Sequence, residues 1–432
     1  MNITEIAAVA KSASIRLAAV KTDVKNNALA EIANVIKRRS VEICAANKED
    51  VSAAQKNHLA APLLKRLKFD REKIGQVVAG IESLIALDDP VGKTLAATEL
   101  DAGLELYKVS CPIGVIGVVF ESRPDALVQI STLCLKSGNA VLLKGGSEAA
   151  RTNRILTETI AEASEKAGLP AGWIQLLETR EDVAQMLALD EYIDLVIPRG
   201  SNEFVRYIMN NTNIPVLGHA EGICHVYADG DADVEMAVNI AVDSKCQYVA
   251  VCNAAETLLV DSAIAGKFLL KVKTALEKKG VELRGCEETA AIIDVKPATE
   301  ADWSTEYLDY ILSIKVVDGL DEAIEHINRY GSKHTDAIVT ADREKAERFM
   351  ALVDSANVFW NCSTRFSDGF RYGLGAEVGI STSKIHARGP VGLEGLVIYK
   401  WKLLGKGQTV ADYSGPNARK FTHEKLDKGF SD

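Results

Sequence analysis

The sequence lacks the features that mark several classes of protein. Its longest apolar runs fall short of the roughly 20 residues that a membrane-spanning helix needs. Basic residues are outnumbered, with 50 Lys and Arg against 60 Asp and Glu, which gives a formal net charge of −10 at pH 7. A nucleic-acid-binding protein would instead present a basic face. We therefore expect a soluble protein that binds neither membranes nor nucleic acids.

Cysteine is also scarce, and its spacing matches no known motif. The eight cysteines lie at positions 44, 111, 134, 224, 246, 252, 286 and 362. They form no CxxC pair and no zinc-like Cys/His spacing, so we predict no metal site. A low density of cysteine in a long chain is typical of the reducing cytosol, and we expect a cytoplasmic protein. Lys11 and Arg16 interrupt the apolar residues of the N-terminal segment, which favours an amphipathic helix over a signal peptide.

The chain changes character several times, as expected for 432 residues, a length that needs two or three domains. Residues 1–87 have helical periodicity throughout. Thr94–Leu100 and Leu104–Val109 flank an Asp-Ala-Gly turn and predict a hairpin. From Ile113 onwards, short apolar strands alternate with helices, which indicates a parallel, Rossmann-like sheet. A second α/β unit begins at about residue 232 and ends near 385.

One thiol, Cys252, stands between two regular elements. Residues 233–246 place apolar side chains on one helical face, and Thr257–Val260 form a short apolar run typical of a buried strand. Cys252 therefore lies in a helix-to-strand loop, from which a thiol can reach a cleft. A thiolate is a strong nucleophile and can hold an acyl group as a thioester. The ordinary alternative for a lone cysteine is a small buried hydrophobe.

Three long segments resemble a known family. They are CNAAETLLV at 252–260, AIEHINRYGSKHTDAIV at 323–339, and NCSTRFSDGFRYGLGAEVGISTSKIHARGPVGLEGL at 361–396. They are similar to signatures of the gamma-glutamyl phosphate reductases, within the aldehyde dehydrogenase superfamily. The resemblance implies an α/β fold with a Rossmann-like cofactor domain, an α/β catalytic domain carrying the nucleophilic cysteine and a small β segment for oligomerisation. We expect the cofactor domain over residues 1–93 and 112–231, the catalytic domain over 232–385, and the oligomerisation segment over 94–111 and 386–415, followed by a tail at 416–432. Within the oligomerisation segment, Val397–Leu404 and Thr409–Tyr413 would be strands added by the chain end.

The resemblance also implies an activity. It is the NADPH-dependent reduction of L-glutamyl 5-phosphate to L-glutamate 5-semialdehyde and phosphate, the second step of proline biosynthesis, through a thioacyl intermediate on Cys252. It further implies a homo-oligomer with functional coupling to glutamate 5-kinase, because the acyl phosphate is labile. An oxidising aldehyde dehydrogenase of the same fold and a non-catalytic scaffold that keeps this fold are the alternatives.

Candidate cofactor residues follow strand ends. Gly200 and Ser201 come directly after an apolar strand and before a helix, where a glycine lets the backbone approach a phosphate and the helix N-terminus supplies donors. They match the Gly-Ser cofactor turn of the superfamily. The resemblance also places Lys144 and Ser147 at the adenosine ribose and Glu306 at the nicotinamide ribose. Since Ser147 replaces a carboxylate, NADPH is favoured over NADH.

Candidate substrate residues are mostly polar loop positions. Ser122 matches an asparagine that holds the oxyanion in the superfamily, where it would act with the backbone N–H of Cys252. Arg123 could bind a phosphate or carboxylate with its fork of N–H donors. The alignment with the dehydrogenases puts His219 at their general-base position. A polar loop with anion-binding character contributes Asn361, Ser363, Thr364 and Arg365.

Overall fold

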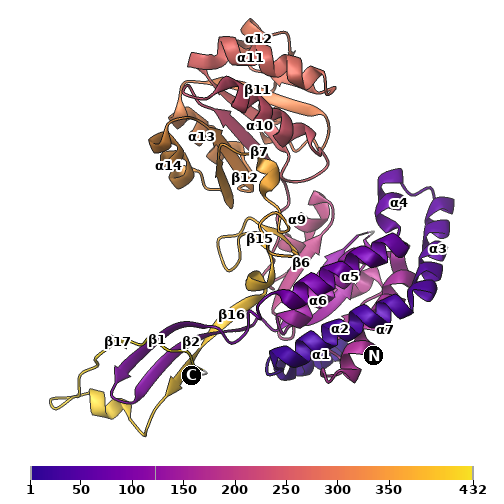
Figure 1. Cartoon of the computed structure of the whole chain (residues 1–432), viewed down its shortest axis with the longest axis vertical. Coiled ribbons are helices and arrows are strands. Elements are labelled where there is room, and N and C mark those ends of the chain that lie inside the picture. The colour runs from indigo at the N-terminus through magenta and orange to yellow at the C-terminus, as the bar shows by residue number, and fades with distance from the viewer. Residues whose placement is uncertain (1, 122, 431–432) are drawn as a thin grey trace.

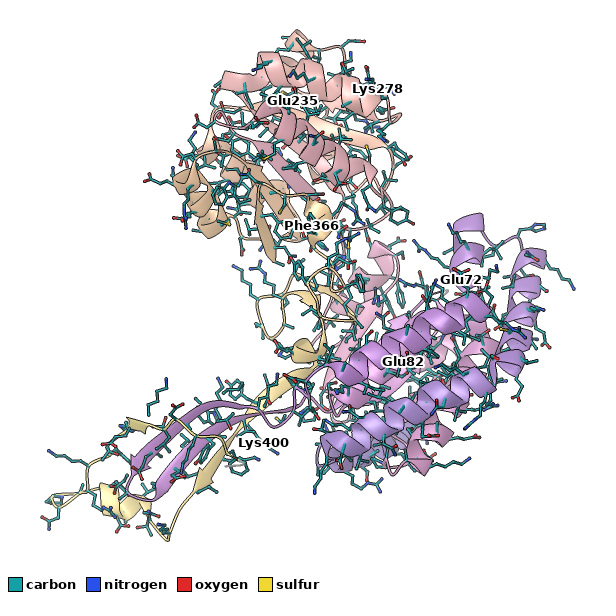
Figure 2. The ribbon with its side chains drawn as sticks, in the orientation of Figure 1. Glu72, Glu82, Glu235, Lys278, Phe366 and Lys400 are labelled. Atoms are coloured by element: carbon teal, nitrogen blue, oxygen red, sulfur yellow. The ribbon has the colours of Figure 1, made fainter. Side chains whose placement is uncertain are left out.

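The computed structural model describes residues 2–121 and 123–430 and shows two α/β domains and an extended β arm (Figure 1). Within the described residues, no helix combines the length and the apolar character needed to cross a membrane. Charged side chains cover the solvent face of the long helices, as Glu72 and Glu82 do on α5 (Arg71–Ala86), and Lys400 projects from the arm (Figure 2). The β segment and both α/β units predicted from the sequence are therefore present.

The first domain consists of a four-stranded parallel sheet packed among helices. Its strand order is β5-β4-β3-β6, with β3 (Val115–Phe120), β4 (Ala140–Lys144), β5 (Ile174–Leu176) and β6 (Leu195–Arg199). Every residue of β3 and β4 is buried, which explains the unbroken apolar runs of these strands. Besides α5, its helices are α1 (Ile3–Leu17), α2 (Thr22–Arg38), α3 (Ser40–Lys56), α4 (Ala61–Leu67), α6 (Pro124–Lys136), η1 (Ser147–Ala149), α7 (Ala150–Lys166), α8 (Arg180–Met186) and α9 (Asn202–Asn210).

The second domain is built on a larger parallel sheet in the order β10-β9-β11-β8-β7-β12-β13. Its strands are β7 (Cys224–Ala228), β8 (Ala255–Asp261), β9 (Glu282–Gly285), β10 (Lys296–Pro297), β11 (Ile311–Val317), β12 (Thr335–Val339) and β13 (Asn357–Trp360). Its helices are α10 (Val234–Cys246), α11 (Ser262–Glu277), α12 (Glu287–Ile292), η2 (Glu300–Ser304), α13 (Leu320–Tyr330), α14 (Arg343–Leu352) and η3 (Thr364–Phe366). Because β7 pairs with β8 and β12, this sheet begins before residue 232, where we expected the domain to start.

The arm is a four-stranded antiparallel sheet in the order β16-β2-β1-β17. The predicted hairpin is confirmed as β1 (Thr94–Asp101) and β2 (Leu104–Pro112), and β16 (Val397–Leu404) pairs along the whole of β2. Residues 409–413, expected as a strand, instead form the 3-10 turn η5 (Val410–Tyr413), which a capping box of Thr409 and Asp412 stabilises. The expected tail also contributes β17 (Glu424–Lys425) to this sheet.

A connecting region joins the arm to the domains. It contains β14 (Gly379–Ser381), β15 (Gly389–Val391) and η4 (Leu393–Leu396). Leu393 and Leu396 are buried in the core of the first domain, and the carbonyl of Leu396 accepts a hydrogen bond from the Asn139 side chain at 2.8 Å. Residues 386–396, expected to belong to the oligomerisation segment, therefore pack on the first domain.

Candidate active site

A cleft of about 660 Å³ between the two α/β domains contains the candidate thiol. It lies at the carboxyl ends of β3 and β6, the edge where parallel sheets bind ligands. Six residues predicted from the sequence line it, namely Arg123, Gly200, Ser201, His219, Cys252 and Glu306. The structure thus brings together residues that are far apart in the chain. Ser122, the predicted oxyanion residue, lies outside the described residues.

Cys252 occupies the predicted loop between α10 and β8 and is half-buried. The backbone of Gly222 packs directly against it, so a Cβ at position 222 would lie 2.1 Å from the carbonyl oxygen of Cys252 and 2.4 Å from its Cα. On another side, the thiol of Cys224 donates to the same carbonyl oxygen at 3.2 Å. Cys252 is therefore held in place by close backbone contact, which requires glycine at 222.

Glu306 joins both sides of the cleft. One carboxylate oxygen accepts a hydrogen bond from the backbone N–H of Gly222 at 2.9 Å, and the other accepts from the Asn202 side chain at 2.6 Å. Asn202 begins α9 in the first domain, whereas Glu306 belongs to the second. The sequence alone suggested a surface position for Glu306, and only the family resemblance placed it at a cofactor.

A buried ion pair beneath the cleft fixes the segment that carries Glu306. Lys245 Nζ lies 2.5 Å from the Glu256 carboxylate, and neither side chain is exposed to solvent. The other Glu256 oxygen accepts from the backbone N–H of Leu308 at 3.2 Å. Burial raises the pKa of Glu256 to about 7, although Lys245 opposes this shift. Sequence reasoning missed both residues, because a Lys on a helix and a Glu in a strand gave no sign of being paired.

His219 lies within reach of the thiol. Its Nδ1 is 2.9 Å from the carbonyl oxygen of Ile380, so Nδ1 carries the proton and Nε2 is left as an acceptor. Burial lowers the pKa of His219, which favours the neutral imidazole. A nitrogen of His219 and the Cys252 sulfur lie no more than 4.8 Å apart. His219 is therefore the candidate general base for the thiol.

Two arginines interact electrostatically with Cys252, the half-buried Arg199 and the buried Arg365. Arg365 was predicted from the sequence, whereas Arg199, at the end of β6 and in the cleft wall, was missed. Burial lowers the pKa of each guanidinium, and a Cys252 thiolate opposes that shift at both. Arginine nonetheless keeps its charge in proteins. Arg199 donates to the carbonyl of Val378 at 2.8 Å, and Arg365 Nε donates to Gln247 at 2.9 Å. Hydrogen bonds therefore hold both positive charges in place in the region of the nucleophile.

The rest of the predicted polar loop binds the protein itself. The Asn361 side chain bonds to the backbone N–H and carbonyl of Thr340, both at 3.0 Å. Ser363 accepts from Ser244 at 3.2 Å and caps η3. Thr364 donates to the carbonyl of Asn253 at 2.7 Å. These internal bonds hold the loop that contacts the Cys252 segment. Anion binding by these three side chains stays a prediction.

The remaining cofactor candidates lie at the end of β4. Lys144 is buried there and donates to the Gly145 carbonyl at 2.5 Å. A Cβ at 145 would lie 2.1 Å from the amide of the buried Asn153, and one at 146 would lie 1.9 Å from the Glu148 carboxylate, which is the movable end of a flexible side chain. Ser147 is exposed in η1, while Glu148 folds back over Gly146. This strand end is an open backbone cradle with a carboxylate at its rim.

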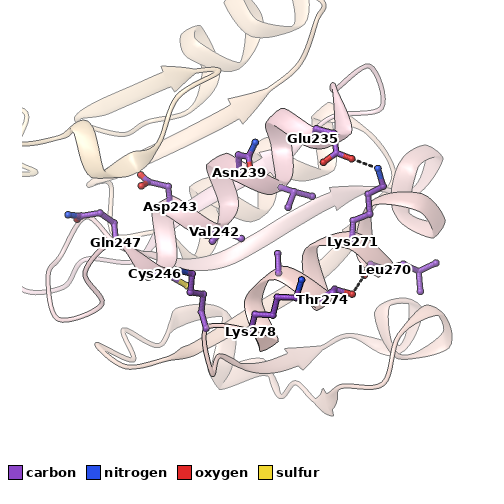
Figure 3. Close-up of a pocket in the computed structure, with 13 residues that line it drawn as sticks. Glu235, Asn239, Val242, Asp243, Cys246, Gln247, Leu270, Lys271, Thr274 and Lys278 are labelled. Atoms are coloured by element: carbon purple, nitrogen blue, oxygen red, sulfur yellow. Dashed lines mark hydrogen bonds and ion pairs between the residues drawn. The ribbon is translucent and has the colours of Figure 1, made fainter.

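A larger hollow of about 790 Å³ lies elsewhere, between α10 and α11 (Figure 3). Its walls carry the ion pair between Glu235 and Lys271 and the Thr274 hydroxyl, which bonds to the Leu270 carbonyl of its own helix at 2.9 Å. It contains none of the residues predicted to take part in chemistry. We therefore place the active site in the smaller cleft.

Comparison with known proteins identifies the family. Residues 1–294 match the model of the aldehyde dehydrogenase family. The gamma-glutamyl phosphate reductase of Acetivibrio thermocellus is 66% identical over 430 residues and covers 100% of both chains. The crystal structure of gamma-glutamyl phosphate reductase from Thermotoga maritima superposes with a TM-score of 0.93 at 41% identity, over 95% of this chain and 100% of that one. An engineered glycolyl-CoA reductase with bound NADP+ shares the fold, with a TM-score of 0.62 at 14% identity over 93% of this chain and 96% of that one.

A Rossmann-like domain, a second α/β domain and a thiol in the cleft between them define an aldehyde dehydrogenase-type oxidoreductase. Within that class, the chain belongs to the gamma-glutamyl phosphate reductase family. The resemblance and the fold class inferred from the sequence are confirmed.

We predict that Gly222→Ala displaces Cys252, because the new methyl group would overlap its backbone. A displacement of about 1 Å should lower turnover roughly 100-fold. The rate of iodoacetamide labelling at Cys252 should change as well. Gly218→Ala is the matched control in the same segment, since its methyl group would meet nothing closer than 3.5 Å. Equal activity of the two variants would show that the contact does not position the thiol.

Proposed function

We propose that the chain reduces L-glutamyl 5-phosphate to L-glutamate 5-semialdehyde with release of phosphate, as the names of its relatives imply. The observation that carries the proposal is a cleft whose lining brings Arg123, Arg199 and His219 together with the Cys252 thiol. A thiol in a cleft lined by permanent cations suits attack on an acyl group that bears an anionic leaving group. Eight free cysteines fit the proposed cytoplasmic location.

Each residue of the site has a separate role in the proposed reaction. His219 accepts the proton of Cys252, and the thiolate attacks the acyl carbon to form a thioester. Arg199, Arg365 and the more exposed Arg123 bind the departing phosphate or the substrate carboxylate. The backbone N–H of Cys252 stabilises the oxyanion. NADPH, when bound, supplies the hydride that reduces the thioester. Collapse of the resulting thiohemiacetal then releases the aldehyde and regenerates the thiolate.

The cleft fits a nicotinamide dinucleotide. Gly200 and Ser201 precede α9 in its wall, where a Cβ at 200 would crowd Phe204 at 3.0 Å and Glu121 at 3.1 Å. The open N-terminus of α9 suits a pyrophosphate, and the Gly145-Gly146 cradle suits the adenosine end. Glu306 would hold the nicotinamide ribose. We therefore propose Lys144, Ser147, Gly200, Ser201 and Glu306 as the cofactor-binding residues.

The arm is the proposed site of self-association. β16 is an edge strand of the arm sheet, so one side of its backbone has no strand partner among the described residues. Tyr399, Trp401 and Leu403 on this strand are 42%, 56% and 55% exposed. An exposed apolar edge strand is a template for pairing with another chain. We propose a homo-oligomer formed through this edge.

The reductase is distinguished from an oxidising dehydrogenase by its need for phosphate. In the reverse direction, oxidation of glutamate 5-semialdehyde by NADP+ should require inorganic phosphate and yield the acyl phosphate. Cys252→Ala should lower both directions roughly a thousandfold or more while keeping NADPH binding. Cys362→Ala is the control. Full-rate oxidation without phosphate that releases free glutamate would contradict the proposal.

Cofactor preference should depend on charge in η1. Ser147→Glu should reduce kcat/KM for NADPH about tenfold more than for NADH, because a carboxylate would repel the 2′-phosphate. Glu148→Gln removes a carboxylate from the same turn and should shift the preference the other way. Measuring kcat/KM with both cofactors for both variants tests this. If neither ratio changes, η1 does not face the adenosine ribose.

Self-association is tested on β16. Trp401→Lys should shift the mass measured by sedimentation equilibrium towards that of a single chain, because the new charge opposes pairing of the edge strand. Val41→Lys, at a 66% exposed position on α3, is the matched control. A mass that Trp401→Lys leaves unchanged would place the interface elsewhere.

A further inference from the structure

Three side chains of types that bind metals come from distant parts of the chain and lie close together, and one of them is Cys252. His219 lies in the segment between α9 and β7, and Cys252 lies in the loop before β8. His334 immediately precedes β12. One ligand atom of each lies within 4.8 Å of the other two. The two imidazole rings meet edge to face with their centroids 4.8 Å apart. The sequence spacing of these residues, all more than 30 positions apart, resembles no metal motif.

Both histidines keep a nitrogen available. His219 uses Nδ1 to donate to the Ile380 carbonyl, which leaves Nε2 as an acceptor. His334 is fully buried, and its Nδ1 lies 2.8 Å from the Thr335 hydroxyl and 3.8 Å from the Cys224 sulfur. Its Nε2 is buried and makes no hydrogen bond among the described residues. An unsatisfied polar atom in the interior is destabilising, so a ligand for this nitrogen would stabilise the site.

The donor set is one that zinc prefers. Two imidazole nitrogens and one thiolate make a three-ligand site with a fourth position open to water. Zn–N bonds of about 2.0–2.1 Å and a Zn–S bond of about 2.3 Å place tetrahedral ligands roughly 3.3–3.7 Å apart. The present separations reach at most 4.8 Å, so side-chain shifts of about 1 Å complete the geometry.

We propose that Cys252, His219 and His334 form a reversible inhibitory site for Zn²⁺ and cations of similar chemistry. On binding, the thiol proton is released to solvent and a Zn–S bond forms. The sulfur lone pair that would attack the acyl group is then engaged by the metal. Zinc and an acyl group therefore exclude one another at Cys252. The inhibitory consequence rests on the proposed role of Cys252 as nucleophile, whereas metal binding itself does not.

The test measures zinc binding apart from turnover. Full-length protein is treated with EDTA, desalted and titrated with ZnCl₂ against a chromophoric chelator. One zinc ion per chain is expected. His334→Gln and His219→Gln should each weaken binding by at least about tenfold, because even an outer-shell partner contributes 10–100-fold. Cys252→Ala should weaken it further and should abolish the thiolate-to-metal charge-transfer band seen with Co²⁺. His386→Gln is the matched control, since its imidazole bonds to the Gly395 carbonyl outside the cluster.

The outcomes test the metal site and the proposed function separately. Unchanged zinc affinity in the Cys252 and His219 variants, or no binding by the wild-type chain, would overturn the metal site. The His219 variant serves this purpose even if loss of the buried His334 prevents folding, which circular dichroism would reveal. If the site binds zinc and activity falls in proportion to occupancy and returns with EDTA, both proposals stand. If zinc binds but Cys252→Ala remains active, the metal site stands and the proposed function fails.

Discussion

The close contact between Gly222 and Cys252 is the constraint on which the cleft depends. The segment around Gly222 carries the chain from the first domain into β7 of the second. Its backbone leaves no room for a Cβ beside the thiol, and its N–H binds the carboxylate of Glu306. One short crossing segment therefore sets the position of the nucleophile and of the proposed ribose-binding group together. Any shift of the crossing would move both.

The buried ion pair of Lys245 and Glu256 also helps to hold the segment that contains the thiol. Lys245 ends α10 and Glu256 lies in β8, so the pair joins the two ends of the loop that contains Cys252. Burying two charges carries a large desolvation cost, and such pairs are weak evidence for stability alone. Here the same carboxylate also holds the backbone of Leu308, two residues beyond Glu306. The pair thus ties the loop to the proposed cofactor-binding segment.

Much of the fold followed from sequence patterns. The apolar run at β3, the hairpin of the arm and the helix-to-strand loop around Cys252 were all predicted, because burial and turn chemistry are local signals. Domain limits were less accurate. β7 was placed in the wrong domain, because a short buried strand does not reveal which sheet it will join. The strand expected at 409–413 failed because a capping box, a side-chain effect, overrode its apolar pattern.

The candidate site was likewise predicted only where the signal was local in the sequence. Cys252 and its neighbours were recognisable from a contiguous motif. Arg199, Lys245 and His334 were not, because their importance comes from partners distant in sequence. Asn361, Ser363 and Thr364 have the composition of an anion-binding loop, and the structure shows the hydrogen bonds that they make within the protein. Composition predicts that a loop needs hydrogen bonds but does not say whether the protein or a ligand supplies them.

The arm has a consequence for the order in which the chain is made. β1 and β2 are translated early, but their neighbours β16 and β17 lie near the C-terminus. During synthesis the hairpin therefore emerges from the ribosome with both edges open, and the α/β domains can collapse before it is covered. Completion of the arm must wait for release of the last residues. A chain truncated before β16 would leave both edges of this early hairpin open, and open strand edges are prone to aggregation.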